Sequence, residues 1–141
     1  MRTSTLFSSI GLVLALGMPS SVALAGYAQS YPVSTDAYSG GGGYASGSVS
    51  SARSSADSQQ FIGCETFAYP GVAPATAEVG AYCAAIGPSG SSQPDVSCST
   101  SDPSLVATAG RINEMSYVAF GFNATGDCTS IYITNSSYML P

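Results

Sequence analysis

Apolar and small or polar residues alternate most regularly between Tyr117 and Asn135. The six bulky or β-branched residues that keep this period are Val118, Phe120, Phe122, Thr129, Ile131 and Ile133. A two-residue turn at Thr125-Gly126 would pair Phe122 with Thr129, Phe120 with Ile131 and Val118 with Ile133. All six then share one face, whereas a slip of one residue would separate the phenylalanines from the isoleucines. The pattern therefore predicts a β-hairpin.

Three other segments have the composition of strands, namely residues 61–69, 79–86 and 96–100. A Gly/Pro/Ser-rich loop joins the last two, which we expect to form a second hairpin. Asp102 followed by Pro103 is typical of a helix start, and Leu105, Val106, Ala109 and Ile112 continue on one helical face for about a dozen residues. These elements predict an α+β fold: a small antiparallel sheet of four to five strands with one helix packed on a face.

The N-terminal 60 residues lack this patterning. A basic start, an apolar run over residues 6–18 and the triplet Ala23-Leu24-Ala25 predict a secretory signal peptide over residues 1–25. No segment is long and apolar enough to predict a transmembrane helix. Glycine and serine fill sixteen positions of residues 26–60, so we expect a flexible tail there. Its tyrosines at positions 27, 31, 38 and 44 fit either an adhesive segment or a plain spacer. The folded domain is expected over residues 61–141.

Charge and composition exclude several partners and reactions. The net charge is −5 and lysine is absent, which disfavours nucleic acid and anionic lipid. Without histidine or lysine the chain cannot build a Ser-His-Asp, Cys-His or Ser-Lys centre. The remaining enzymatic alternative is glycan hydrolysis by two carboxylates, drawn from a set of five in the expected domain. These are Glu65, Glu78, Asp95, Glu114 and Asp127.

The chain offers candidate ligands for two kinds of metal site. Asn123 and Asp127 could offer oxygens to calcium, but they are too few for a calcium loop and also suit the flanks of a turn. The cysteines, at positions 64, 83, 98 and 128, lack the close pairs and histidines of zinc sites. We therefore predict no catalytic residue, no cofactor and no metal.

Four cysteines in an exported chain favour two disulfides, for which three connectivities are possible. Pairing Cys64 with Cys83 and Cys98 with Cys128 is preferred, because each bond closes a moderate loop and the second ties the 117–135 hairpin to the middle of the domain. Each bond would contribute roughly 3–4 kcal/mol to stability.

Three stretches, AYCAAIGPSG, VSCSTSDPSLVATAGRIN and SYVAFGFNATGDCTSIYITNSSY, are similar to small exported cysteine-containing bacterial proteins of unknown function. The resemblance implies an exported small domain and brings no activity with it. We expect a non-enzymatic secreted protein, extracellular or periplasmic, that binds a cell-surface or matrix polymer or associates with itself. The alternatives are a secreted inhibitor or toxin acting on another protein, and the carboxylate-based hydrolase.

Overall fold

The computed structural model describes residues 29–71 and 76–136, so the expected signal peptide lies outside the described residues. The described residues form seven strands and two short helices. In chain order these are β1 (Ser34–Ala37), β2 (Gly43–Ser48), α1 (Val49–Arg53), β3 (Phe61–Tyr69), β4 (Glu78–Ile86), β5 (Val96–Thr100), α2 (Pro103–Ala109), β6 (Ser116–Phe122) and β7 (Cys128–Asn135). No described helix has the length and apolarity needed to span a bilayer.

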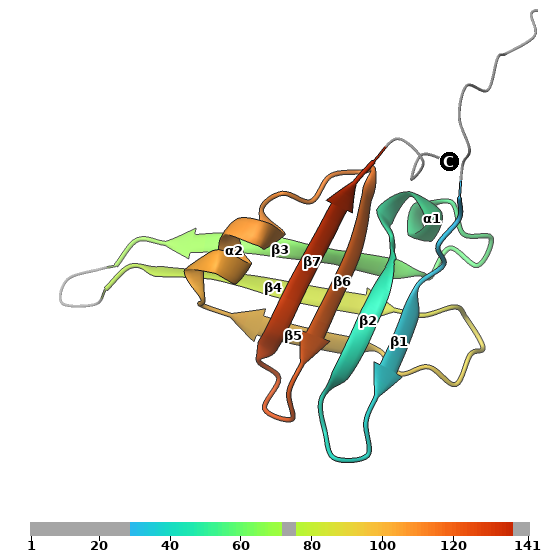
Figure 1. The fold of residues 1–141 in the computed structure, drawn as a ribbon, viewed down its shortest axis with the longest axis horizontal. Coiled ribbons are helices and arrows are strands. Elements are labelled where there is room, and N and C mark those ends of the chain that lie inside the picture. The colour runs from blue at the N-terminus through green and yellow to red at the C-terminus, as the bar shows by residue number, and fades with distance from the viewer. Residues whose placement is uncertain (1–28, 72–75, 137–141) are drawn as a thin grey trace, which may run out of the picture.

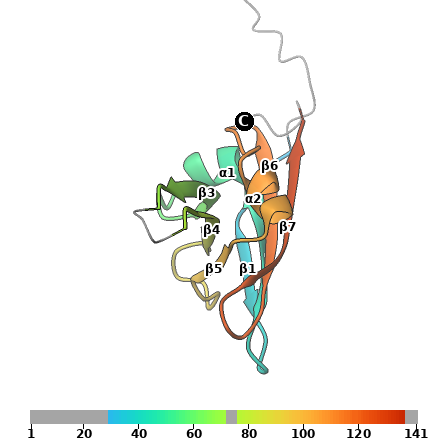
Figure 2. The same ribbon diagram turned by 90° about the vertical axis from the view of Figure 1, so that its left-hand side faces the viewer.

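The strands form two antiparallel sheets that pack face to face. One sheet has the order β1-β2-β6-β7 and the other the order β3-β4-β5. Figure 1 shows the strands of one sheet crossing those of the other, and Figure 2 shows the two layers side by side. The arrangement is a sandwich with crossed strands. Its shared core includes Ile62, Ala81, Val96, Val118 and Phe120, all buried.

The β6–β7 hairpin has the predicted central register. Val118 pairs with Ile133 and Phe120 with Ile131, with Val118 and Phe120 fully buried. The tip differs from the prediction, because Phe122 pairs with Cys128 rather than Thr129. Gly126 has a φ of +83° and donates its N–H to the Asn123 carbonyl, and a bulge on β7 absorbs the extra residue. The connection is thus a three-residue loop with glycine in the left-handed conformation.

The predicted second hairpin is present as β4–β5, and β3 joins it on the other side of β4. The expected single sheet of four to five strands is therefore wrong, because seven strands divide between two sheets. A sequence pattern with period two indicates which side chains of a strand face the core. It cannot indicate to which of two sheets the strand belongs, because both layers of a sandwich point their apolar side chains into the same core.

The predicted helix begins as expected. The Asp102 side chain accepts hydrogen bonds from the N–H groups of Ser104 (2.9 Å) and Leu105 (3.0 Å), and Pro103 occupies the first turn. It ends at Ala109, with Gly110 as its C-cap, and is shorter than predicted. A second helix, α1, was not predicted. Each helix contacts strands of both sheets, α2 lying against β3, β4 and β7 and α1 against β2, β3 and β6, so packing of one helix on one face is not confirmed (Figure 2).

The expectation of a flexible tail over residues 26–60 is wrong for residues 34–53. These residues form β1, β2 and α1, and Ala45 and Ser48 are buried. The strand pattern of β2 is hard to recognise because glycine stands at inward positions. Side chains or backbone of neighbouring elements fill the space that a larger residue would occupy there. A Cβ on Gly43 would lie 2.6 Å from the Phe122 ring, and one on Gly47 would lie 3.0 Å from the Cα of Val33. The interior side chains at these positions come from adjacent elements.

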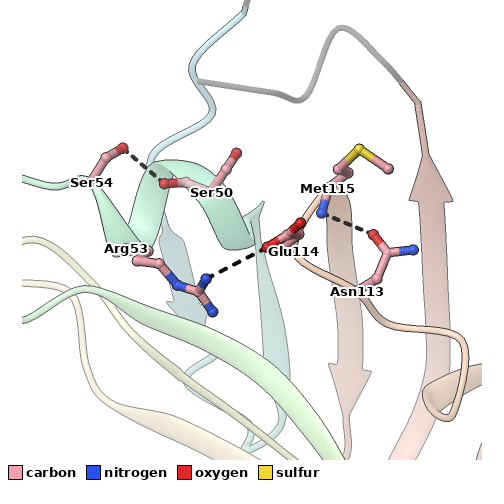
Figure 3. A network of polar contacts seen from close by, with 6 residues as sticks. All are labelled: Ser50, Arg53, Ser54, Asn113, Glu114 and Met115. Atoms are coloured by element: carbon pink, nitrogen blue, oxygen red, sulfur yellow. Dashed lines mark hydrogen bonds and ion pairs between the residues drawn. The ribbon is translucent and has the colours of Figure 1, made fainter.

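One ion pair joins α1 to the segment between α2 and β6 (Figure 3). Arg53 and Glu114 form an ion pair of 3.9 Å, with both side chains largely exposed, so we expect it to contribute little to stability. The Asn113 side chain accepts from the Met115 N–H at 2.9 Å. Nearby, the buried Ser116 hydroxyl accepts from the Asn113 N–H at 2.8 Å and donates to Asn135 Oδ1 at 2.5 Å. These bonds fix the entry into β6.

Candidate binding surface

The polar cluster at the β6–β7 tip satisfies its own hydrogen bonds. Asn123 Oδ1 accepts from the N–H groups of Thr125 (3.0 Å) and Asp127 (2.9 Å), and Asn123 Nδ2 donates to Asp127 Oδ2 (3.1 Å). The Thr125 hydroxyl lies 2.5 Å from Asp127 Oδ2 and, with the Asn123 amide, lowers the pKa of Asp127. Asn123 and Asp127 therefore act as turn residues, and their oxygens are engaged in the loop itself.

The five candidate carboxylates lie in separate places. Glu65 and Glu78 share the outer face of the three-stranded sheet, but their register places them four positions apart along the strands, roughly 13 Å. A glycosidase pair requires about 5–10 Å. Asp95 precedes β5, Glu114 pairs with Arg53, and Asp127 belongs to the hairpin tip. The arrangement does not assemble a two-carboxylate centre from these residues.

The four cysteines form one row inside the sandwich. Disulfides join Cys64 to Cys83 and Cys98 to Cys128, which is the pairing preferred from the sequence. The register aligns Cys64, Cys83 and Cys98 across β3, β4 and β5, while Cys128 reaches them from β7. The sulfurs of Cys83, Cys98 and Cys128 lie within 4.8 Å of one another. Because all four are oxidised, the row holds the sheets together and offers no thiolate.

A different set of residues gathers on the outer face of the β1-β2-β6-β7 sheet. Pairing sets the face of each side chain, since residues opposite each other across strands point the same way. Tyr44 lies opposite Gly121, and Tyr132 lies opposite Ala119, which in turn pairs with Ser46. Phe120 and Val118 point inward, so Tyr117, Ala119 and Gly121 point outward. This face turns toward the viewer in Figure 1. Its described residues are mostly Ser, Thr, Gly, Ala and Tyr, with Asp36 as the charged member.

Tyr44 and Tyr117 lie on the neighbouring strands β2 and β6 of this sheet. The Tyr44 side chain approaches those of Tyr117 and Ser46. Tyr44 and Tyr117 sit four positions apart on neighbouring strands, about 13 Å along the sheet. Their hydroxyls can meet only if both rings lean toward each other over the small residues Ser46 and Ala119. Partial burial and the neighbouring Tyr117 hydroxyl raise the pKa of Tyr44 above its ordinary 10.0, so Tyr44 is neutral at neutral pH.

Three further tyrosines extend this area, which we call the tyrosine face and define as Tyr31, Tyr38, Tyr44, Tyr117 and Tyr132. The Tyr31 ring packs edge-on against Tyr117 with centroids 5.4 Å apart. Tyr38 lies two residues beyond Asp36 of β1 and is 62% exposed, and Tyr132 is 61% exposed. The face thus combines a fixed centre with two exposed rings at its margins.

The spacing of Tyr31, Tyr38 and Tyr44 is visible in the sequence, but their glycine- and serine-rich surroundings predict a flexible tail. Tyr117 and Tyr132 were not singled out, although each alternates with an inward residue of the predicted hairpin. Outward tyrosines on that hairpin were the available signal. Their union with the N-terminal tyrosines depends on β2 pairing with β6, a contact between segments some 70 positions apart in the chain.

Comparison of the chain with protein-family models, with curated proteins and with solved structures finds no match. The surface is therefore interpreted from its own chemistry.

Proposed function

We propose that this is an exported, non-enzymatic protein that binds a neutral extracellular polysaccharide through the tyrosine face. The observation that carries the proposal is the collection of five tyrosines on one sheet face among small hydroxyl-bearing residues. Tyrosine offers a rigid apolar ring together with a polar hydroxyl, and it loses little conformational entropy on binding.

The chemistry of the face fits sugars. Pyranose rings present C–H groups that pack on aromatic rings, while their hydroxyls bond to Ser, Thr and Tyr side chains at the rim. The face is part of a sheet rather than a closed cavity, which suits a long polymer lying across it. The negative net charge of the chain favours a neutral polymer over an acidic one.

Binding to insoluble polymers tests the proposal. We would measure depletion of the protein from solution by cellulose, chitin and other neutral β-linked glycans. Tyr132→Ala should weaken binding about 5- to 150-fold, taking about 1–3 kcal/mol for a stacked aromatic ring. Tyr132 is exposed, so its loss should leave the fold intact. Tyr44→Phe, which keeps the ring, should retain most of the affinity.

Tyr69→Ala is the matched control, because Tyr69 is equally exposed but lies on the other sheet. It should bind like the unchanged protein. Equal loss in the Tyr69 and Tyr132 variants would indicate non-specific adsorption, and no binding to any neutral glycan would overturn the proposal.

A further inference from the structure

β3 is an edge strand whose outward backbone N–H and C=O groups have no hydrogen-bond partner among the described residues, although α1 and α2 both lie against the strand. The β1 edge is four residues long, and the N–H groups of Val33 and Thr35 donate to Gln60 and Gln93 side chains. On the β5 edge, the Ser99 N–H donates to the Gly126 carbonyl of the hairpin tip. The β7 edge is interrupted by a bulge. Each device limits pairing with another chain.

In contrast, β3 spans nine residues with no proline, no basic residue and one acid, Glu65. Its pairing with β4 has no bulge. Cys64 and Cys83 have Cα atoms 4.0 Å apart, the spacing of a non-hydrogen-bonded pair, so the backbone groups of Cys64 point away from β4. By alternation the same holds for Ile62, Thr66 and Ala68. No other described residue donates to or accepts from this edge.

The surroundings of the edge are apolar on both faces of the strand except for Glu65, which lines the outer side. A cavity of about 290 Å³ flanks β3, with Val49, Ile62 and Ile112 on the inner side and Phe61, Tyr82 and Ala84 on the outer side. An added strand would place alternate side chains against these two groups, which is how strand addition combines backbone bonding with side-chain contacts.

We infer that β3 pairs with β3 of a second copy of this chain, antiparallel about a two-fold axis at Cys64, to form a continuous six-stranded sheet. In that register Thr66 exchanges backbone hydrogen bonds with Ile62 of the second copy, and Phe61 lies opposite Phe67 of the second copy. Glu65 then faces Gly63, which has no side chain to oppose it.

The position of Glu65 selects this register. Moving the axis to Glu65 would set two carboxylates directly opposite, which is destabilising. Moving it to Gly63 would place Phe61 opposite Glu65 and shorten the paired segment. With the axis at Cys64, the two Glu65 side chains are diagonal neighbours, about 7–8 Å apart, so their repulsion is reduced but remains. The inference is independent of sugar binding, since the tyrosine face lies on the other sheet.

Sedimentation velocity of the full chain from about 10 µM to 1 mM would test the pairing, together with amide hydrogen exchange. We expect a concentration-dependent dimer and slower exchange at the Cys64 and Thr66 amides as concentration rises. Thr66→Pro removes a donor that β4 does not use, and it deletes two symmetry-related bonds, so dimerisation should weaken at least about tenfold. Thr66→Val keeps the N–H and should dimerise like the unchanged protein.

Glu65→Gln supplies a second test that does not depend on weakening the strand. Removing the diagonal repulsion should tighten the dimer about two- to fivefold at low salt. The inference is overturned if the chain stays monomeric up to 1 mM, if Thr66→Pro folds and dimerises undiminished, or if open-ended polymers form instead of a closed dimer.

Discussion

Replacing Cys98 and Cys128 with alanine should remove the covalent link between the two sheets. The bond closes a loop with a sequence separation of 30, for which the chain-entropy relation gives about 3.6 kcal/mol at 25 °C. A domain of this size has a free energy of unfolding of about 5–15 kcal/mol, so the loss would take a quarter or more of the total. Both sulfurs are buried, and loss of their packing adds to the effect.

Equilibrium urea denaturation, followed by circular dichroism, would measure the change. The free energy of unfolding of the Cys98→Ala/Cys128→Ala variant should fall by about 3–4 kcal/mol. Its denaturant slope should rise, because an unfolded chain without the cross-link exposes more surface. The matched control is Cys64→Ala/Cys83→Ala, whose loop separation of 19 gives about 3.2 kcal/mol.

A loss below about 1 kcal/mol with an unchanged slope would refute the reasoning, since the bond would then not restrict the unfolded chain. A loss in the inter-sheet variant far above that in the control would show that the native contact between sheets, rather than loop closure, dominates.

Two other changes test local features. Asp57 accepts from the Ser89 N–H at 2.9 Å and from the Gln59 N–H at 3.2 Å, and these bonds, Ser89 first, lower its pKa well below the ordinary 3.8. The stabilisation by the Asp57 carboxylate should therefore be full above pH 3.8 and vanish as the pH falls through the lowered pKa of the folded protein. Thermal unfolding should show that Asp57→Asn is less stable than the unchanged protein at pH 7 and equally stable in strong acid. Gly126→Ala should cost about 1–2 kcal/mol in urea unfolding, because φ is +83° there although no atom crowds the new methyl group, and an unchanged stability would contradict the three-residue loop.

The β6–β7 hairpin shows how far the sequence could predict the fold. Val118, Phe120, Ile131 and Ile133 share a face in only one register, so burial alone determined the pairing. The tip was less constrained, since glycine at position 126 suits a two-residue turn as well as a three-residue loop with a bulge. The error there is one residue and leaves the core unchanged.

The first sheet was missed for a different physical reason. Strand patterns are recognised by large apolar side chains at alternate positions, but β2 places only Gly43, Ala45 and Gly47 inward. Phe122 and Val33 fill the space beside the two glycines. Its composition matched a flexible linker, which also lacks large apolar groups. The tyrosine face could not be predicted for the same reason, because Tyr44 meets Tyr117 only through the β2–β6 pairing.

The position of Cys128 also determines how the molecule responds to mechanical tension. The segment between Cys98 and Cys128, which contains α2 and β6, lies within a covalent loop and cannot lengthen under a pull. At the other margin of the same sheet, β1 is held to β2 by four residue pairs and has no covalent tie. A load applied ahead of β1 therefore strips that strand first, while β6 and the bonded end of β7 remain clamped to the opposite sheet.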